Sequence, residues 1–322
     1  GAIGTGLFMG AGRNIAVAGT SILVIYVLVG FFTYMVMRAM GELLLTRHDY
    51  RSFADFVGEY LGPQASFYLG WTYWLSWVVT CIADVVVCGS YMQYWFPELS
   101  AWMPALSMLA ILFLLNLLSV KMFGEAEFWF ALIKVVAIVC FLVVCGMAVV
   151  NLWPTGEVHG ISNLTAVEGF MPNGIVPVLT GAVAATGFYF GAEIVTIAAA
   201  ETAEPQKAVA KATNSVILRV LVFYVGSVLL VACLVPWNST GMSMPYVSAL
   251  DAMGVPAAAQ IMNAVVLTAV LSALNSGLYA SSRMLFALTR RGDAPKVLAQ
   301  VSRNGVPVYA ILVATLFGYG AI

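Results

Sequence analysis

The chain alternates long apolar runs with short polar segments, and this pattern predicts a series of membrane-spanning helices. About 20 predominantly apolar residues are enough for a helix to cross the hydrocarbon core of a bilayer. We expect the second half of one span at residues 1–12, a ninth span that starts near Pro307, and complete spans at residues 17–44, 64–96, 101–120, 126–150, 175–203, 212–235 and 257–289.

The segments between the spans carry turn and capping signals. Arg13 and Asn14 are predicted to form the turn after the first apolar run, and residues 151–174 a long polar loop. Ser52 is suited to cap a short surface helix that ends near Gly62, because a serine oxygen accepts the free N–H groups of a first helical turn.

Glycine interrupts two of the apolar runs, at Gly1, Gly4 and Gly6 and again at Gly187 and Gly191. Glycine favours a break in a helix, and non-helical backbone at membrane depth survives only against protein or a water-filled cavity. Two interrupted spans in corresponding halves of a chain are typical of transporters that bind a ligand near the bilayer midplane. We therefore expect two discontinuous helices whose exposed peptide groups hold a ligand.

Composition supports a membrane location. Of the 322 residues, 62% are hydrophobic and 9% are charged, and the mean hydropathy is +0.95, whereas a soluble domain carries about 25% charged residues. The sequence therefore predicts an all-α polytopic membrane protein. Because it opens without a methionine inside one apolar run and stops inside another, we expect a fragment truncated at both ends.

The basic residues are distributed unequally between the two sides of the predicted spans. Arg13 lies on one side and Lys134 inside a span, and the other side carries Arg38, Arg47, Arg51, Lys121, Lys207, Lys211, Arg219, Arg283, Arg290, Arg291, Lys296 and Arg303. Basic residues concentrate in cytoplasmic loops. We therefore place the loops after spans two, four, six and eight in the cytoplasm.

Ionisable side chains inside spans are functional candidates, because each costs about 2.5–3.5 kcal/mol at the centre of a helix on insertion scales. Lys134 lies two turns into span five, and a lysine removed from water can exchange its proton near neutral pH. Glu127 is seven residues earlier on the same helical face. The alternative is a lysine that reaches the cytoplasmic interface with the help of Glu127.

Three further carboxylates are candidates. Asp84, deep in span three, could meet a substrate ammonium, carry a proton or pair with another span. Glu193, at the second glycine break, could pair with an ammonium, carry a proton or accept from freed N–H groups. Glu201, near the cytoplasmic end of span six, is interpreted as a gate or an end-of-helix charge.

Other side chains near the breaks permit both packing and binding. Phe188, Tyr189 and Phe190 straddle the second break and either cover a ligand or pack ordinarily. Span eight carries a polar stripe that includes Ser272 and Ser276. Interhelical hydrogen bonds explain most such residues, and ligand binding is the alternative for these two serines.

Several functional classes are excluded by what the sequence lacks. It has no H-E-x-x-H, G-x-S-x-G or Walker motif, so we predict no enzyme, and no stretch is long enough for a soluble nucleotide-binding domain. The five cysteines lie in apolar runs without metal-ligand spacing, so they are expected to be buried. We predict no metal, no other cofactor and no nucleic-acid partner.

Five stretches have a distinctive order of residues: Gly1-Ala2-Ile3-Gly4-Thr5-Gly6-Leu7-Phe8, Phe128-Trp129-Phe130-Ala131-Leu132-Ile133-Lys134, Gly191-Ala192-Glu193-Ile194-Val195, Ala200-Glu201-Thr202-Ala203-Glu204-Pro205 and Asn275-Ser276-Gly277-Leu278-Tyr279. Together they resemble the bacterial amino-acid permeases of the amino acid–polyamine–organocation superfamily, over the whole chain. The resemblance is nearest to the 4-aminobutyrate, aromatic, D-serine/alanine/glycine and asparagine permeases.

The resemblance implies a LeuT-like fold of twelve spans with two inverted five-helix repeats, in which helices 1 and 6 are broken. Residues 1–322 would be one transporter domain, with repeat one at about 1–150 and repeat two, incomplete, at about 175–322. It also implies proton-coupled import of a small amino acid, neutral or 4-aminobutyrate, across the bacterial inner membrane. The partners would be the amino acid, the proton and the lipid bilayer.

The resemblance also implies roles for residues. Backbone N–H groups of Gly4, Thr5 and Gly6 would bind the substrate carboxylate, and carbonyls around Ile3 and from Phe188 to Gly191 would bind its ammonium. Lys134 would occupy the place that a sodium ion fills in sodium-coupled relatives, which favours protons. The substrate site is further assigned Tyr189, Asp84 and Ser272, proton coupling is assigned Lys134 and Glu193, and gating is assigned Glu127 and Glu201.

Asp84 stands where several family members carry glutamate, and Tyr189 where smaller residues are common, so the substrate is not fixed. The alternatives are an amino-acid exchanger without net proton coupling and, from another class, a membrane amino-acid sensor. A channel is disfavoured because no ring-forming filter is visible. The sequence does not indicate the oligomeric state.

Overall fold

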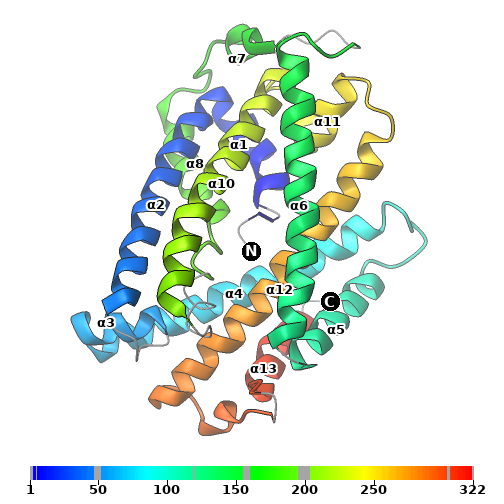
Figure 1. Ribbon diagram of the computed structural model, residues 1–322. Coiled ribbons are helices and arrows are strands. Elements are labelled where there is room, and N and C mark those ends of the chain that lie inside the picture. The colour runs from blue at the N-terminus through cyan, green and yellow to red at the C-terminus, as the bar shows by residue number, and fades with distance from the viewer. Residues whose placement is uncertain are drawn as a thin grey trace.

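The computed structural model describes residues 3–4, 6–46, 52–118, 120–154, 160–194, 204–302 and 305–320 (Figure 1). These residues form helices and connecting turns, with no strand among them. Among them, four helical segments are long and apolar enough to cross a membrane: Gly6–Leu43, Pro63–Met92, Lys121–Val149 and Ala258–Arg291. Shorter apolar helices cover Trp102–Leu118, Ile175–Gly187, Leu221–Leu234 and Val308–Tyr319.

The outer surface of the helix bundle is apolar. Large side chains such as Phe32, Val36, Trp129 and Val143 are exposed on α2 (Ile22–Thr46) and α6 (Val120–Val149). Such a surface is stable against lipid and unfavourable in water. The protein is therefore an all-α integral membrane protein, as the composition predicts.

The first described element is a π-helix, Gly6–Gly10, which continues into α1, Ala11–Ala18. The predicted turn at Arg13 and Asn14 is wrong, because both residues lie inside α1. The chain reverses instead at Gly19, whose φ of 71° is in the region that glycine tolerates. Figure 1 shows α1 and α2 running in opposite directions on either side of this reversal.

The next helices agree with the predicted spans apart from their ends. The Ser52 hydroxyl accepts from the N–H of Ala54 at 3.0 Å, and the Asp55 carboxylate accepts from the N–H of Ser52 at 3.1 Å. This capping box starts the predicted surface helix, so the Ser52 prediction is confirmed. The bounds here are α3, Phe53–Leu61; α4, Pro63–Met92; and α5, Trp102–Leu118.

Two helices start earlier than their apolar windows indicate. The apolar span predicted to begin at residue 126 misses the start of α6 at Val120, because the first turns of this helix are polar. Likewise α10, Pro205–Leu234, starts at a proline, which the first helical turn accepts without loss of a hydrogen bond. The predicted loop 151–174 also contains short helices, Gly160–Ser162 and α7, Asn163–Ala166.

Of the span predicted at 175–203, the structure describes residues 175–194, in which the helix ends at Phe188. Helix α8 covers Ile175–Phe188, and residues 189–193 form a turn in which Gly191 has a φ of 104°. The remaining elements are the 3-10 helix Thr240–Ser243, α11 (Pro245–Ala252), α12 (Ala258–Arg291), the 3-10 helix Lys296–Ala299 and α13 (Val308–Tyr319).

Helix α12 is the centre of the packing. It contacts α4, α5, α6, α11 and α13, and its side chains between Ser272 and Ser282 are all buried. A Cβ on Gly277 would lie 2.6 Å from Cys81 Sγ and 3.0 Å from Trp77 Cε3. The absence of a side chain at Gly277 therefore sets the close approach of α12 to α4.

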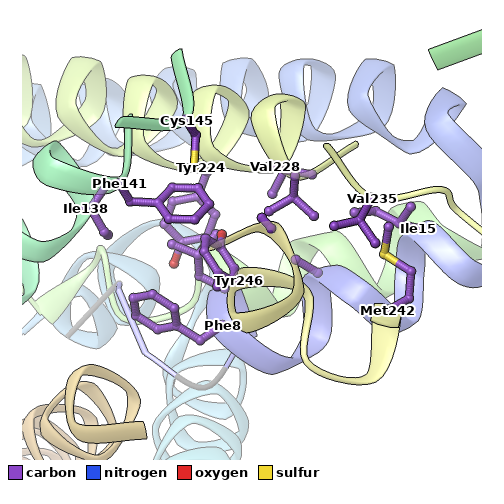
Figure 2. Close-up of a cluster of buried hydrophobic side chains, with 14 of the residues drawn as sticks. Phe8, Ile15, Ile138, Phe141, Cys145, Tyr224, Val228, Val235, Met242 and Tyr246 are labelled. Atoms are coloured by element: carbon purple, nitrogen blue, oxygen red, sulfur yellow. The ribbon is translucent and has the colours of Figure 1, made fainter. Parts of the chain in front are cut away.

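A cluster of aromatic side chains packs the π-helix against neighbouring helices. The Phe8 ring lies edge-on to the Tyr246 ring with centroids 5.1 Å apart, and Phe141 contacts the same tyrosine at 4.9 Å. Figure 2 shows these rings together with Tyr224 and Cys145. The cluster joins the π-helix to α6, α10 and α11, so it places the start of α1 relative to three other helices.

Candidate functional site

The end of α1 is joined to the start of α8. At the end of α1, Asn173 Nδ2 donates to the carbonyl oxygen of Val17 at 2.8 Å, and Thr20 Oγ1 lies 2.8 Å from the carbonyl oxygen of Leu164 and 3.1 Å from that of Phe170. Residues 164–173 lead directly into α8, so α1 ends where α8 begins. The two helices are antiparallel, and α8 packs against both α1 and the π-helix.

Both breaks therefore lie at the same depth. Residues Gly6–Ala18 and Ile175–Phe188 form stretches of nearly equal length. At 1.5 Å per residue each reaches about 20 Å from the joint that they share. The π-helix starts, and α8 ends, near this depth. The positive end of one helix dipole and the negative end of another are thus brought to one level of the molecule.

Before the π-helix, at the predicted first break, the backbone is non-helical at Ile3 and Gly4. The N–H groups of Leu7 and Phe8 donate to the Gly4 carbonyl oxygen at 3.2 and 3.4 Å, which closes the first turn. The first N–H groups of a helix have no partner within it. The start of the π-helix at Gly6 is therefore chemically suited to an anion, while Thr5 lies outside the described residues.

At the second break the Glu193 carboxylate supports the turn. One of its oxygens accepts from the N–H of Gly191 at 2.8 Å, and the other accepts from the Tyr73 hydroxyl at 3.1 Å. The Phe190 ring packs at a tilt against the Trp77 ring, with centroids 4.7 Å apart. Residues Tyr73 and Trp77 of α4 thus cover this turn from one side, and Glu193 links it to α4.

Lys134 joins the first break to α6 and α12. Its ammonium donates to the carbonyl oxygen of Ile3 at 3.2 Å and to Ser272 Oγ at 2.7 Å. The Ser272 hydroxyl donates in turn to Glu127 Oε1 at 2.7 Å. Lys134 is 3% exposed and Ser272 is fully buried. A buried charge is stable only when it is paired and hydrogen-bonded, and this arrangement meets both conditions.

The other predicted residues lie as follows. Asp84 is 1% exposed on α4, with Cys81 and Cys88 one turn to either side. The Tyr189 hydroxyl donates to the carbonyl oxygen of Tyr26 at 2.9 Å, and its ring stacks on Tyr224 at 5.1 Å. Tyr189 is therefore used in packing between α2 and α10.

Phe188 is the last residue of α8. The remaining candidate, Glu201, lies outside the described residues.

Sequence reasoning missed Tyr73 as a partner of Glu193. The residue spacing along α4 does contain a signal. Tyr73, Trp77 and Asp84 are separated by four and seven residues and so share one face of this helix. A hydrogen bond between two side-chain amides was also missed. Asn116 Nδ2 donates to Asn275 Oδ1 at 2.9 Å and so connects α5 to α12. No local pattern shows that these two positions meet.

A small pocket of about 40 Å³ lies where α4 ends and α12 begins. Its lining includes Phe8 on the π-helix, Tyr91, Tyr246, Met262 and Asn263. Phe8 is one turn from Gly4, so the pocket lies beside the first break. Its wall is largely apolar, with a few polar groups.

Comparison with known proteins gives one consistent result. The family model described as amino acid permease matches residues 1–322. The chain is 45% identical to a D-serine/D-alanine/glycine transporter of Escherichia coli O6:H1 and 46% identical to a gamma-aminobutyric acid permease of Bacillus subtilis. Both alignments cover 100% of this chain and 69% of the relative.

An L-asparagine permease of Salmonella typhimurium is 44% identical, over 99% of this chain and 65% of that protein. The resemblance inferred from the five sequence stretches is thereby confirmed over their whole span. With its buried lysine, its apolar surface and these relatives, this chain belongs to the amino acid permease family.

Proposed function

We propose that this protein is a secondary active transporter that imports a small amino acid together with a proton across the bacterial inner membrane. The observation that carries the proposal is the bond from Lys134 Nζ to the Ile3 carbonyl oxygen, which places an ionisable group of α6 on the backbone of the first break. A proton gained or lost at Lys134 then acts directly on the segment that borders the ligand.

The ends of the two interrupted helices supply recognition of a zwitterion. The start of the π-helix offers N–H groups to a carboxylate near Gly4 and Gly6, and the last turn of α8 offers carbonyl oxygens near Phe188 to an ammonium. One such helix end contributes about 0.3–1 kcal/mol when exposed and up to about 2 when partly buried. Two ends acting on opposite charges of one ligand favour an amino acid over a simple anion or cation.

The relatives indicate the size of the substrate. Their names specify D-serine, D-alanine, glycine, gamma-aminobutyric acid and asparagine, all of which are small molecules with one carboxylate and one ammonium. We infer a substrate of the same class for this chain. Its fold would be the LeuT-like inverted repeat, with the loops after spans two, four, six and eight in the cytoplasm, as the basic residues favour.

The test uses the intact protein in proteoliposomes loaded with buffer alone. An inward proton gradient should drive accumulation of labelled glycine, alanine, 4-aminobutyrate or asparagine above equilibrium. Lys134→Ala should abolish this accumulation, whereas Lys121→Ala, which removes an exposed lysine from the same helix, should leave it intact. Full uphill uptake in Lys134→Ala would remove this lysine from the mechanism.

The same vesicles separate the two rival functions. An exchanger would take up label only when unlabelled amino acid is present inside, and it would ignore the proton gradient. A sensor would bind label and transport it under neither condition. Either result with the wild-type protein would overturn proton symport.

A further inference from the structure

Lys134, Ser272 and Glu127 form one continuous chain of hydrogen bonds. The Lys134 ammonium donates to Ser272 Oγ at 2.7 Å, and the Ser272 hydroxyl donates to Glu127 Oε1 at 2.7 Å. Lys134 and Glu127 are seven residues apart on α6, which is two helical turns or about 10 Å along the axis. Ser272 of α12 bonds to both side chains, so a hydroxyl of a second helix links the two ends of this chain of hydrogen bonds.

Exposure increases along this chain in one direction. Lys134 and Ser272 are buried, Glu127 is half-buried, and Glu125 and Lys121 beyond it are exposed. The chain of bonds therefore runs from the core towards the N-terminal end of α6. In the proposed orientation this end faces the cytoplasm, because α6 follows the loop after span four.

Ionisable groups around this chain of hydrogen bonds lie on α6 and on the helices packed against it. The carboxylate that acts on the Lys134 ammonium is that of Glu127. On α12, the Arg283 guanidinium lies 4.7 Å from the centroid of the Tyr279 ring, and this ring stacks on Phe123 of α6. The helices packed against α6 carry these further titratable groups: Tyr279, Arg283, Arg290 and Arg291 on α12 and Lys207, Lys211, Arg219, Tyr224 and Cys233 on α10, while α5 carries none.

We propose that Glu127 accepts the transported proton from Lys134 through the Ser272 hydroxyl and delivers it towards the cytoplasm. The inference rests on the proposed proton symport and assigns a step within it. One N–H bond of the Lys134 ammonium breaks as its proton moves to Ser272 Oγ, and the original Ser272 hydroxyl proton moves to the Glu127 carboxylate. The products are a neutral amine, an unchanged hydroxyl and a carboxylic acid.

Two physical features favour this step. Both donor–acceptor distances lie within the range of about 2.6–3.2 Å over which a positioned group transfers a proton. The transfer also converts a positive and a negative charge inside the protein into two neutral groups, which are less costly away from water.

The step also has a consequence at the ligand site. The bond from Lys134 to the Ile3 carbonyl oxygen changes from a charge-assisted bond to a neutral one, which is about half as strong. Loss of the proton thus weakens the hold of α6 on the first break, so proton delivery and ligand release are linked through one bond.

The test compares two transport modes in proteoliposomes containing the intact protein. Counterflow exchange of labelled against unlabelled amino acid needs no net proton movement, whereas uptake driven by a proton gradient does. We expect Glu127→Gln and Ser272→Ala to lower the ratio of proton-driven uptake to counterflow at least tenfold. Ser272→Thr, which keeps the hydroxyl, should restore the ratio.

Matched controls lie on the same helices. Glu125→Gln removes an exposed carboxylate two residues from Glu127, and Ser282→Ala removes a buried hydroxyl that bonds only to the Tyr279 carbonyl among the described contacts. Both should keep the wild-type ratio. A pH-sensitive dye inside the vesicles should also report less acidification per substrate molecule in Glu127→Gln and Ser272→Ala.

The outcomes separate the relay from the transport function. A wild-type ratio in Ser272→Ala, or loss of counterflow in parallel with proton-driven uptake, would overturn the relay and leave proton symport standing. Absence of any proton-driven uptake by the wild-type protein would instead overturn the proposed function itself.

Discussion

Among the described glycines, Gly12 is the one where a single added methyl group should disturb the helix packing most. A Cβ at this residue would lie 2.1 Å from the carbonyl oxygen of Met242 and 2.9 Å from Cγ of Pro245. An ordinary contact begins near 3.4 Å, so α1 would have to move about 1.3 Å from the 3-10 helix before α11. The nearest atom is backbone, which cannot rotate away.

We therefore expect Gly12→Ala to lower the free energy of unfolding by about 1–3 kcal/mol, the usual cost of overpacking a core. The displacement also moves the break at Gly4 relative to Lys134, whose ammonium lies 3.2 Å from the Ile3 carbonyl oxygen. A misplacement of about 1 Å near a reacting group can cost about a hundredfold in rate. Uptake should thus fall by more than the loss of folded protein explains.

The assay measures thermal unfolding of the purified protein in detergent together with initial uptake rates per folded molecule. Gly146→Ala is the control, because a Cβ there meets nothing within 4 Å. Pro245→Ala should fail to rescue Gly12→Ala, since it removes only the more distant contact. Wild-type stability in Gly12→Ala, or full rescue by Pro245→Ala, would refute the packing argument.

Three further changes test other contacts. Gly277→Ala should destabilise the α4–α12 contact, and Cys81→Ala should partly rescue it in a double-mutant cycle, because the nearest atom here is a side-chain sulfur. Ser52→Ala should cost about 1 kcal/mol through loss of the α3 cap, seen as lower thermal stability, whereas Ser52→Asn should not. Tyr73→Phe removes the donor to Glu193 and should raise the KM for uptake up to about tenfold, corresponding to about 1.4 kcal/mol; an unchanged KM would show that this bond does not position the turn.

Local chemistry made several features predictable. Ser52 and Asp55 act within one helical turn, and Gly191 adopts a backbone conformation that its own lack of a side chain permits. The turn that follows α8 and the surface helix α3 therefore lie where local sequence favours them. The apolar windows also located the long helices, although polar first turns hid the start of α6.

Distant contacts explain the errors. The reversal lies at Gly19 and not at Arg13, because Gly19 packs against Pro172, which is far away in sequence. The sequence placed Lys134 inside a span but did not reveal that Ile3 and Ser272 would meet its ammonium, since the three residues come from three separate segments. Such meetings depend on the tertiary packing of α12, which no local spacing encodes.

The hydrogen bonds of Thr20 and Asn173 have a mechanical consequence. Because α1 and α8 are joined at one end, the distance between their other ends can change only if the helices rotate about this joint. With arms of about 20 Å, a pivot of about 10° changes that gap by about 3.5 Å, roughly the width of one methyl group. Because the two helices are long, a small rotation near Gly19 changes the distance between their free ends enough to distinguish one small side chain from the next.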